Sequence, residues 1–294
     1  MLSRHDVDQA EGLRRLLLPP SLRVVTVLGA RVGLGATSVA VNLAAALAAA
    51  GREVLVLDEN RSTCNVANTL ALKPRYDLID AVRGDKHWRE VMLRAAGGVH
   101  VLPVARAMQA LPALHDAERD SLLASLTAAT RAMNVVLVDA AADGHSVCAS
   151  LSGDEPLLLV LNPTASGITE SYALLKQMAM RHGRQAFDIV VNKARNEHEA
   201  RAVFDNMFQV AQRHLQVRLT YLGNIPQDDK MKRASELCKP LMEVFPAAPS
   251  ALALGELARK LMLLPASECN GSNALTVVMQ RMLRQAGQRH AMQY

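Results

Sequence analysis

The chain has 294 residues, of which 50% are hydrophobic and only 3% aromatic, and its formal net charge is +5. A chain of this length can bury about 75% of the surface that it exposes when unfolded, so one large domain or two small ones with an aliphatic core are expected. Such a composition favours an α/β fold over a β-sandwich. The basic residues are interspersed with acidic ones, so the charge does not predict direct binding to nucleic acid.

Cysteine use, the N-terminus and the apolar runs indicate the compartment. The cysteines at positions 64, 148, 238 and 269 form no C-x-x-C pair and no metal spacing with histidine, which is typical of reduced thiols in a cytosolic protein. No apolar core of a secretory signal is visible at the N-terminus. Residues 32–51 are uncharged and long enough to span a bilayer, but they are mostly alanine, so a core helix beneath a sheet explains them better.

Residues 24–60 predict one βαβ unit, in the order strand, glycine-containing turn, alanine-rich helix and strand. The first strand is 24–28, the helix stops near Gly51, and the second strand, 54–57, ends at Asp58. A right-handed crossover places the start of this helix at the carboxyl edge of a parallel sheet, where nucleotides bind. Backbone N–H groups and the helix dipole favour a phosphate at that point.

The turn alone leaves three interpretations open. A Walker A loop, G-x-x-x-x-G-K-[ST], would use Gly35 and Thr37, but Ala36 stands where the motif has its phosphate lysine. A Rossmann turn, G-x-G-x-x-G, would use Gly33 and Gly35, with Asp58 about 20 residues further on as the ribose acid. The third interpretation is a structural βα turn without a ligand.

Residues 31–38, R-V-G-L-G-A-T-S, with Asn42 in the following helix, resemble the deviant Walker A motif of the MinD/ParA family, K-G-G-V-G-K-T-S. The resemblance implies a doubly wound, mostly parallel α/β sheet of the SIMIBI P-loop class that binds ATP and Mg²⁺. Arg31 then occupies the place of the signature lysine, which in the family crosses a dimer interface to the partner's phosphates. The implied cofactor-binding residues of the loop are Gly33, Leu34, Gly35, Ala36, Thr37 and Ser38, with the Thr37 hydroxyl on Mg²⁺.

Two strand ends carry the carboxylates that the family uses. Residues 58–60, D-E-N, stand at its D-x-D motif, whose second aspartate orients the attacking water in relatives. Asp58 and Asn60 are therefore catalytic candidates beside Arg31, and Asp58 is also a candidate Mg²⁺ ligand. Asp139 ends the strand 134–139 where an aspartate holds Mg²⁺ through water, but the D-T-G-A-G of relatives is D-A-A-A-D here. Because an amide cannot accept a proton, hydrolysis is expected to be weakened more than binding.

Three later segments also resemble the MinD/ParA family, and a Rossmann dehydrogenase explains none of them. Residues 162–176 resemble the segment T-P-E-P-T-S-I-T-D-A-Y-A-L-I-K. A later strand places Asn192 at the family's adenine-reading position, where an amide offers both a donor and an acceptor. Residues 219–228 resemble the G-x-I-P-x-D loop that closes over adenine, which makes Pro226 and Asp228 cofactor-binding candidates.

The stretches between these motifs predict structure that covers the sheet. Apolar residues recur at helical spacing through residues 116–132, which predicts an amphipathic helix. Short helices are expected at 76–83 and 88–95, and strands at 99–103 and 156–161.

Residues 1–23 precede the first strand and carry D-Q-A-E-G-L-R at positions 8–14, followed by a proline pair that ends any helix and marks a linker. A solvated arm is one explanation. However, D-Q-A-x-x-L-R upstream of a MinD-like domain resembles the flagellar-number regulators FlhG, also called FleN or YlxH. That resemblance implies that the arm engages the SRP-type GTPase FlhF through Asp8, Gln9, Leu13 and Arg14.

The expected domains are this arm (1–23), a MinD-like P-loop domain (24–264), and a linker with a short helical tail (265–294). Relatives dock a C-terminal amphipathic helix on the inner membrane when they are dimeric, and packing on the protein's own domain is the alternative. The tail has one apolar face opposite basic and polar residues, formed by Leu275, Met279, Met282, Leu283 and Ala286.

The resemblance favours a cytoplasmic FlhG-type regulator of flagellar number and placement. Its expected location is the periphery of the inner membrane, and a position at the cell pole is a further expectation. Expected partners are FlhF, a second copy in an ATP-dependent homodimer, and flagellar basal-body or transcription-regulator proteins. Two mechanisms stay open: an active ATPase switch, or a binding protein that has lost hydrolysis. The alternative is the MinD-like protein of bacterial cellulose secretion, which also tolerates a damaged Walker A and against which the arm argues.

Overall fold

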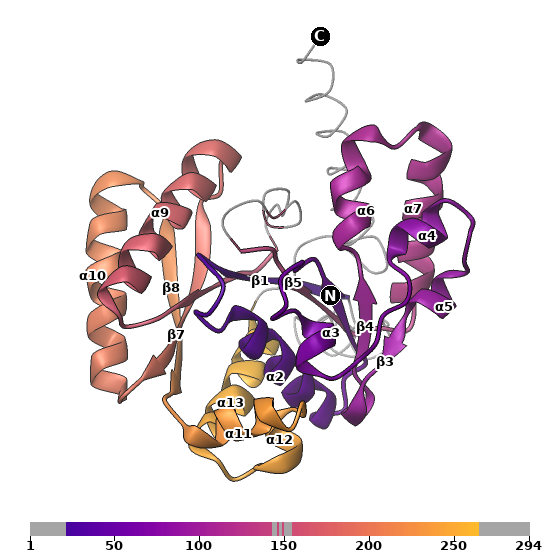
Figure 1. The fold of residues 1–294 in the computed structure, drawn as a ribbon. Helices are drawn as coiled ribbons and strands as arrows, with labels where there is room; N and C mark the ends of the chain where they lie inside the picture. Colours follow the sequence, from indigo (N-terminus) through magenta and orange to yellow (C-terminus); the bar gives the residue numbers. More distant parts are fainter. Residues whose placement is uncertain (1–21, 143–145, 147–148, 150–154, 265–294) are drawn as a thin grey trace, which may run out of the picture.

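The computed structural model describes residues 22–142, Ser146, Ala149 and 155–264. Its strands are β1 (Arg23–Gly29), β2 (Val54–Asp58), β3 (Leu93–Arg94), β4 (His100–Pro103), β5 (Val135–Asp139), β6 (Leu157–Leu161), β7 (Ala186–Ala194) and β8 (Arg218–Pro226). They form one sheet in the order β3-β4-β2-β5-β1-β6-β7-β8, parallel throughout except for the pair of β3 and β4 (Figure 1). The predicted doubly wound, mostly parallel sheet is confirmed.

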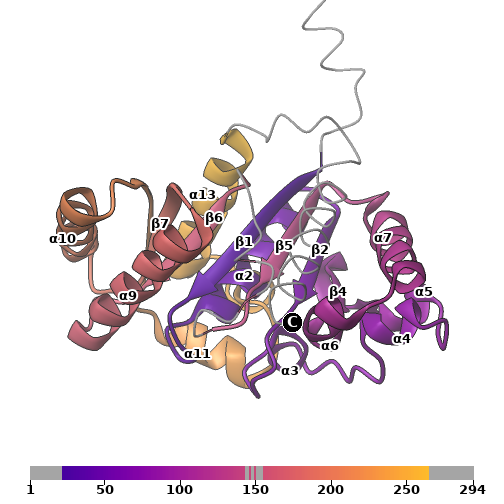
Figure 2. The same ribbon diagram turned by 90° about the horizontal axis from the view of Figure 1, so that it is seen from above.

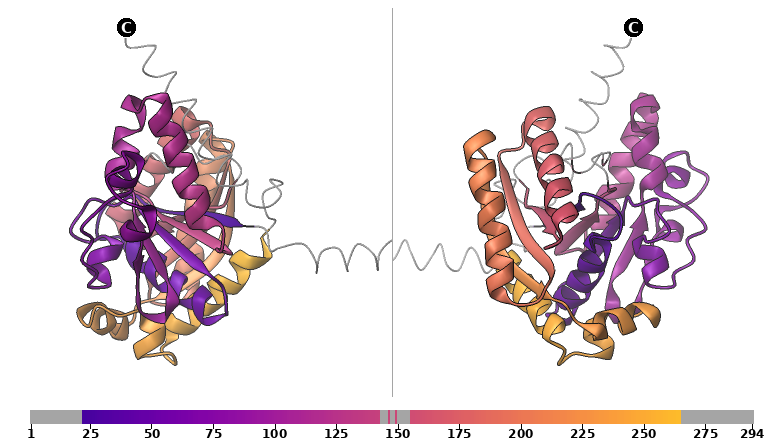
Figure 3. Two further views of the ribbon diagram at one scale, coloured as in Figure 1. Left: turned by 90° about the vertical axis from the view of Figure 1, so that its right-hand side faces the viewer. Right: turned by 60° about the vertical axis from the view of Figure 1, so that its left-hand side comes forward.

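Helices cover both faces of the sheet. They are α2 (Ala36–Ala49), α3 (Val66–Thr69), α4 (Leu78–Val82), α5 (Trp88–Val91), α6 (Ala105–Ala110), α7 (Asp116–Thr130), α9 (Ala165–His182), α10 (Glu197–His214), α11 (Asp229–Glu236), α12 (Leu241–Val244) and α13 (Pro249–Leu263). Helices α2 and α13 pack side by side on one face, with α11 and α12 beside them (Figures 1 and 3). Helix α3 contacts α2 and β4, and the remaining helices form two groups, α4 to α7 and α9 with α10, at opposite ends of the sheet (Figure 2).

The core follows from the alternation of side chains along the strands. In β2, Val54 and Val56 pack in the cluster that contains α2, whereas Leu55 and Leu57 pack against α4, α6 and α7. A third cluster surrounds Phe187, between the sheet and helices α9 and α10. Phe187 is the one aromatic side chain among the buried apolar residues of the described chain, so the core is aliphatic, and the strands are buried on both faces as parallel sheets require.

Helix α2 lies in the interior. Its residues 39–47 are all buried, so the uncharged run of residues 32–51 is a loop followed by a core helix. Among the residues that the structure describes, no helix combines the length and the apolar character needed to cross a bilayer.

Two predicted elements differ from the structure. The helix expected at 88–95 ends at Val91, and Leu93–Arg94 forms β3, because a turn through Gly97 at a φ of 70° brings Arg94 back opposite His100. The loop expected at 219–228 is strand β8 as far as Pro226, and only residues 227 and 228 lie outside regular structure before α11. The arm motif at residues 8–14, which is predicted to bind FlhF, and the C-terminal tail lie outside the described residues, so the domain boundaries stay predictions.

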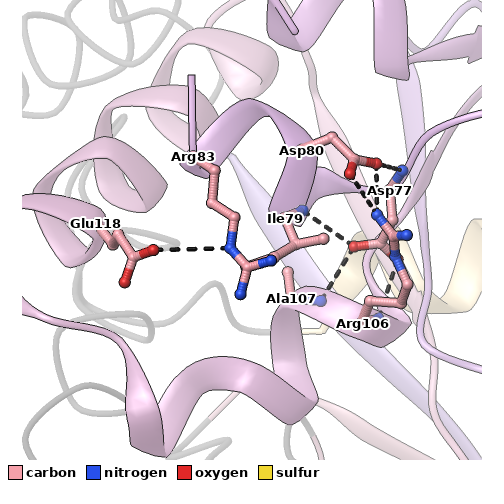
Figure 4. A network of polar contacts seen from close by, with 7 residues as sticks. All are labelled: Asp77, Ile79, Asp80, Arg83, Arg106, Ala107 and Glu118. Carbon is pink, nitrogen blue, oxygen red and sulfur yellow. Dashed lines mark hydrogen bonds and ion pairs between the residues drawn. The ribbon is translucent and has the colours of Figure 1, made fainter. Parts of the chain in front are cut away.

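One buried carboxylate, that of Asp77, holds the starts of two helices together (Figure 4). Its Oδ1 accepts hydrogen bonds from the backbone N–H groups of Ile79 in α4 and Ala107 in α6, at 3.1 and 3.0 Å, and its Oδ2 accepts from the N–H of Arg106 at 3.0 Å. The Arg106 guanidinium also pairs with Asp80. This network positions α6, whose residues 105, 108 and 109 line a small cavity beside the end of β2.

We expect Asp77→Ala to lower the free energy of unfolding by about 3 kcal/mol, because two buried N–H groups and one half-buried N–H group lose their acceptor. Urea denaturation followed by circular dichroism measures this change. The matched control is Asp116→Ala, in which the same substitution removes an exposed acid from the first turn of α7; it should cost about 0.5 kcal/mol or less. Equal losses in the two variants would mean that Asp77 does not hold α4 to α6.

Candidate functional site

The loop between β1 and α2 lies at the carboxyl end of the central strand, where the chain order of the strands reverses. Gly33 and Gly35 have φ angles of 94° and 99°, which residues with a side chain rarely adopt. A Cβ at Gly35 would also lie 2.2 Å from Nδ2 of Asn192. The first turn of α2 has no side-chain cap and no acidic residue, so its N–H groups are placed to bind an anion.

Strand β7 contacts the phosphate loop through two consecutive residues. The Asn192 amide donates to the carbonyl of Leu34 at 3.1 Å, and the Lys193 ammonium donates to the carbonyl of Gly33 at 3.2 Å. Asn192 therefore lies against the loop as well as lining the large cavity beside it. Its role as the adenine-reading residue stays a prediction.

Two of the residues predicted to bind Mg²⁺, Thr37 and Asp139, form a short chain of hydrogen bonds with the catalytic candidate Asn60. The Asn60 amide donates to Oγ1 of Thr37 at 3.0 Å, and the Thr37 hydroxyl donates to Oδ2 of Asp139 at 2.9 Å. Asp139 is fully buried, and its Oδ1 has no hydrogen-bond partner among the described residues. Hydroxyl and carboxylate oxygens are the ligands that Mg²⁺ prefers, and an unpaired buried carboxylate oxygen fits such an ion.

Three buried carboxylates meet at the ends of β2 and β5. Asp58 accepts from the backbone N–H groups of Asn60 at 3.2 Å and Ala67 at 3.1 Å, so it orders the chain after β2 as well as standing near Asp139. Glu59, which the sequence analysis missed, accepts from the Ser146 hydroxyl at 2.5 Å and the Ala141 N–H at 3.4 Å. The only sequence signal for Glu59 was that an acidic residue stands at the middle, variable place of the D-x-D motif.

Burial changes the acid–base behaviour of two of these carboxylates. Burial raises the pKa of Asp139 to about 8, and the neighbouring Asp58 adds to the rise although hydrogen bonds from Thr37 and Asn60 oppose it. Burial also raises the pKa of Asp58 to about 6, against the hydrogen bonds from Ala67 and Asn60. Without a cation, Asp139 therefore holds a proton near neutral pH.

The predicted dimer residue, Arg31, forms an ion pair with Glu170 in the second turn of α9. The side chains are 48% and 39% exposed, so the pair is open to solvent and is worth little to stability. Within this chain the arginine is thus directed to a carboxylate of its own protomer. The sequence identified Arg31 but not its partner.

Two cavities share the loop. The larger, of about 690 Å³, is lined by Gly35, Asn162, Asn192, Pro226 and Asp228 among others, and it lies where the family's adenine site was predicted. The smaller, of about 400 Å³, is lined by Arg31, Gly33, Ala36, Thr37, Asn60 and Lys193 among others, and it contains the phosphate loop. Gly35, Ser38, Lys193 and Ser235 line both cavities, so the two adjoin.

Other residues of the predicted motifs form hydrogen bonds that join the helices beside these cavities. Asp228 caps α11 through the Lys230 N–H at 2.9 Å and accepts from the Ser250 hydroxyl at 2.7 Å. Burial acts to raise the pKa of Asp228, but these hydrogen bonds outweigh it and hold the pKa below its ordinary value. Asn42 joins the first turn of α2 to the start of α12, because its amide donates to the Ser38 carbonyl at 2.8 Å and accepts from the Leu241 N–H at 2.6 Å.

The sheet and this loop define an α/β P-loop protein with a deviant Walker A motif, in which Ala36 replaces the phosphate lysine. A family model described as "Cellulose biosynthesis protein BcsQ" matches residues 22–262. "Antiactivator FleN" of Pseudomonas aeruginosa is 34% identical over 240 residues, which cover 81% of this chain and 86% of FleN. The chain therefore belongs to the MinD/ParA family, and within it to the family that the BcsQ model describes.

Two more distant relatives agree with this assignment. "Flagellum site-determining protein YlxH" of Helicobacter pylori is 23% identical over 226 residues, 76% of each chain. The solved structure of the septum site-determining protein MinD complexed with Mg-ADP, from Pyrococcus horikoshii, has a TM-score of 0.62 at 21% identity and covers 82% of this chain and 96% of its own. The predicted resemblance to MinD/ParA and FleN proteins is confirmed, and the structural likeness supports the fold.

The raised pKa of Asp139 predicts how stability depends on pH. The folded chain keeps a proton that the unfolded chain releases above the ordinary pKa of 3.8, so the free energy of unfolding falls as the pH rises from about 4 to about 8. Asp139→Asn, which resembles the protonated acid, should therefore be more stable than the native chain by about 2 kcal/mol or more at pH 8.

Urea denaturation in buffer containing EDTA measures this difference, which should shrink at pH 5. Asp120→Asn on the surface of α7 is the matched control and should show no such pH dependence. A less stable Asp139→Asn protein at pH 8 would show that the native carboxylate is ionised and well paired.

Proposed function

We propose that this protein is a MinD-like regulator of flagellar number and placement, of the FleN and FlhG type, that binds adenine nucleotide and hydrolyses it weakly or not at all. The observation that carries the proposal is the 34% identity to FleN over most of both chains. The proposed partners are the GTPase FlhF and a second copy of the chain, with flagellar basal-body or transcription-regulator proteins as further candidates. The C-terminal helix would attach the dimer to the inner surface of the membrane.

Nucleotide binding is supported by the residues that remain around the loop. The N–H groups at the start of α2 suit phosphates, Thr37 and Asp139 suit Mg²⁺, and the cavity of about 690 Å³ beside Asn192 has room for a base and ribose. Bound Mg·ATP would supply the charge that the family uses to join two protomers. In that dimer Arg31 would leave Glu170 and contact the partner's phosphates.

Weak hydrolysis is supported by the residues at the place where the γ-phosphate of a bound ATP would lie. Ala36 supplies no cation, and Asn60 donates its amide to Thr37 where relatives have a carboxylate. The N–H of Ala141, in the segment that follows β5, donates to Glu59. A backbone donor of that segment is thereby engaged within the protein, and the group that would orient an attacking water cannot accept a proton.

We expect ATP turnover ~10³-fold or more below that of intact relatives, because each of the two lost groups typically supplies a few kcal/mol of transition-state stabilisation. The double variant Ala36→Lys with Asn60→Asp should raise turnover by about tenfold or more, measured as phosphate release with Mg·ATP. Asn65→Asp, which keeps the cap of α3, is the matched control for the added charge and should leave turnover unchanged. Ordinary ATPase turnover that Asn60→Asp does not alter would refute the proposal of weak hydrolysis.

The arm is proposed to act on FlhF independently of the degenerate loop. Gln9 and Arg14 are groups able to orient a water or to meet developing charge on a transferring phosphate. A peptide of residues 1–20 should therefore raise GTP hydrolysis by FlhF of the same organism, and Gln9→Ala or Arg14→Ala in the peptide should lower the maximal rate about tenfold or more. Arg15→Ala, which removes the neighbouring charge, is the control.

If the arm only tethers the two proteins, both substitutions will weaken binding without changing the maximal rate at saturating peptide. A peptide that neither binds FlhF nor alters its rate would remove the strongest support for the flagellar assignment.

A second candidate function is a role in bacterial cellulose secretion, favoured by the match of residues 22–262 to the BcsQ model. That match covers the P-loop domain and not the arm with its FlhF motif. Deleting the gene separates the two candidates: altered flagellar number with normal cellulose supports the first, and lost cellulose with normal flagella supports the second.

A further inference from the structure

Lys193 lies at the phosphate loop because strand β7 is irregular at its end. Consecutive side chains of a regular strand point to opposite faces, but the register of β7 against β8 shifts between Asn192 and Ala194, and Lys193 has a φ of 63°. As a result, Asn192 and Lys193 both contact the loop, at Leu34 and Gly33. A left-handed conformation is costly for a residue with a Cβ and is held only where the surrounding structure requires it.

The cavity around the phosphate loop has few positive charges. Among the described residues that line it, Arg31 and Lys193 are the two cations. Arg31 is paired with Glu170, whereas the contact of Lys193 is with a neutral carbonyl, that of Gly33. The position that carries the lysine of a Walker A motif is Ala36, whose side chain supplies no charge.

We propose that Lys193 is the phosphate-binding cation of this protein and takes over, from strand β7, the role that the loop's own lysine has lost. Lys193 lines both cavities, and its ammonium lies 3.2 Å from the carbonyl oxygen of Gly33, a residue that lines the smaller cavity. A polyphosphate on the N-terminus of α2 would receive one unshared positive charge from this side chain. The inference rests on the proposed nucleotide binding and names the residue on which that binding depends.

Lys193 could instead serve only to tie β7 to the loop. The two roles differ in which ligands they affect. A phosphate-binding cation matters for ATP and for inorganic tripolyphosphate but not for adenosine, whereas a structural tie affects all three ligands through the shape of the site. Lys193→Met removes the charge and keeps the aliphatic stem, which makes it the suitable substitution.

The experiment is isothermal titration calorimetry of the full chain with Mg·ATP, tripolyphosphate and adenosine. Lys193→Met should weaken binding of ATP and tripolyphosphate by about tenfold or more, as expected for the loss of one charged contact, and leave adenosine within about twofold. Lys232→Met is the matched control, because Lys232 lines the large cavity but not the phosphate cavity. Adding Ala36→Lys to Lys193→Met should restore the phosphate-dependent affinity.

Three results with the variants would overturn the inference: unchanged tripolyphosphate binding in Lys193→Met, an equal loss of adenosine affinity, or an equal effect of Lys232→Met. Failure of the native chain to bind either ATP or tripolyphosphate would overturn both this inference and the proposed nucleotide binding. Native binding that Lys193→Met leaves unchanged would overturn the inference alone. The thermal unfolding midpoint of each variant shows whether it is folded.

Discussion

The carboxylate of Asp139, buried at the end of a central strand, is the constraint on which the site depends. A carboxylate that is buried away from water must be neutralised by a proton or a cation, or must accept hydrogen bonds. In this chain one oxygen accepts from Thr37, the second residue of α2, and the other oxygen has no partner among the described residues. The strand, the loop and the helix are thereby joined at one point. The bond also turns the Thr37 hydroxyl toward the carboxylate that would share a metal ion with it.

Asn60 completes this arrangement in a way that an aspartate could not. Its amide donates to Thr37, which donates to Asp139, so every hydrogen in this series points toward the carboxylate. An ionised aspartate at position 60 would offer only acceptors and would add charge beside Asp58 and Asp139. The asparagine therefore stabilises the site without a bound cation, and the same exchange removes the group that would order a water for hydrolysis. Satisfied hydrogen bonding in the free state and the weak hydrolysis proposed above would then have one cause.

The fold could be predicted from the sequence because its main elements carry strong local signals. The aliphatic strands that end at Asp58 and Asp139, and the alanine-rich helix between Gly35 and Gly51, occur where the sequence placed them, whereas the strand that carries Asn192 continues to Ala194. The short β3 carries too few residues for such a signal, and its pairing depends on a glycine turn and on β4. Helices α4 and α6 are joined by Asp77, a contact across about 30 positions that no local pattern reveals.

The site was predictable at the level of its motifs but not of its contacts. The structure has Gly33, Gly35 and Thr37 in the loop and at the helix start where the motif spacing placed them, and Asp139 at the strand end where its motif placed it. Glu59, Glu170 and the orientation of Lys193 were missed, because each depends on where another strand or helix passes.

The ends of β1 and β7 explain how a P-loop can lose its lysine and keep its shape. Gly35 leaves room for the amide of Asn192, and that amide holds the loop through Leu34 in the place of contacts from a bound phosphate. The loop is therefore held by a contact that does not involve the side chain of residue 36. In the proposed arrangement, the charge that would bind phosphate, on Lys193, and the amide that holds the loop, on Asn192, thus belong to different residues. A chain in which they are separate can lose rapid turnover without losing the surface that the loop presents to a partner.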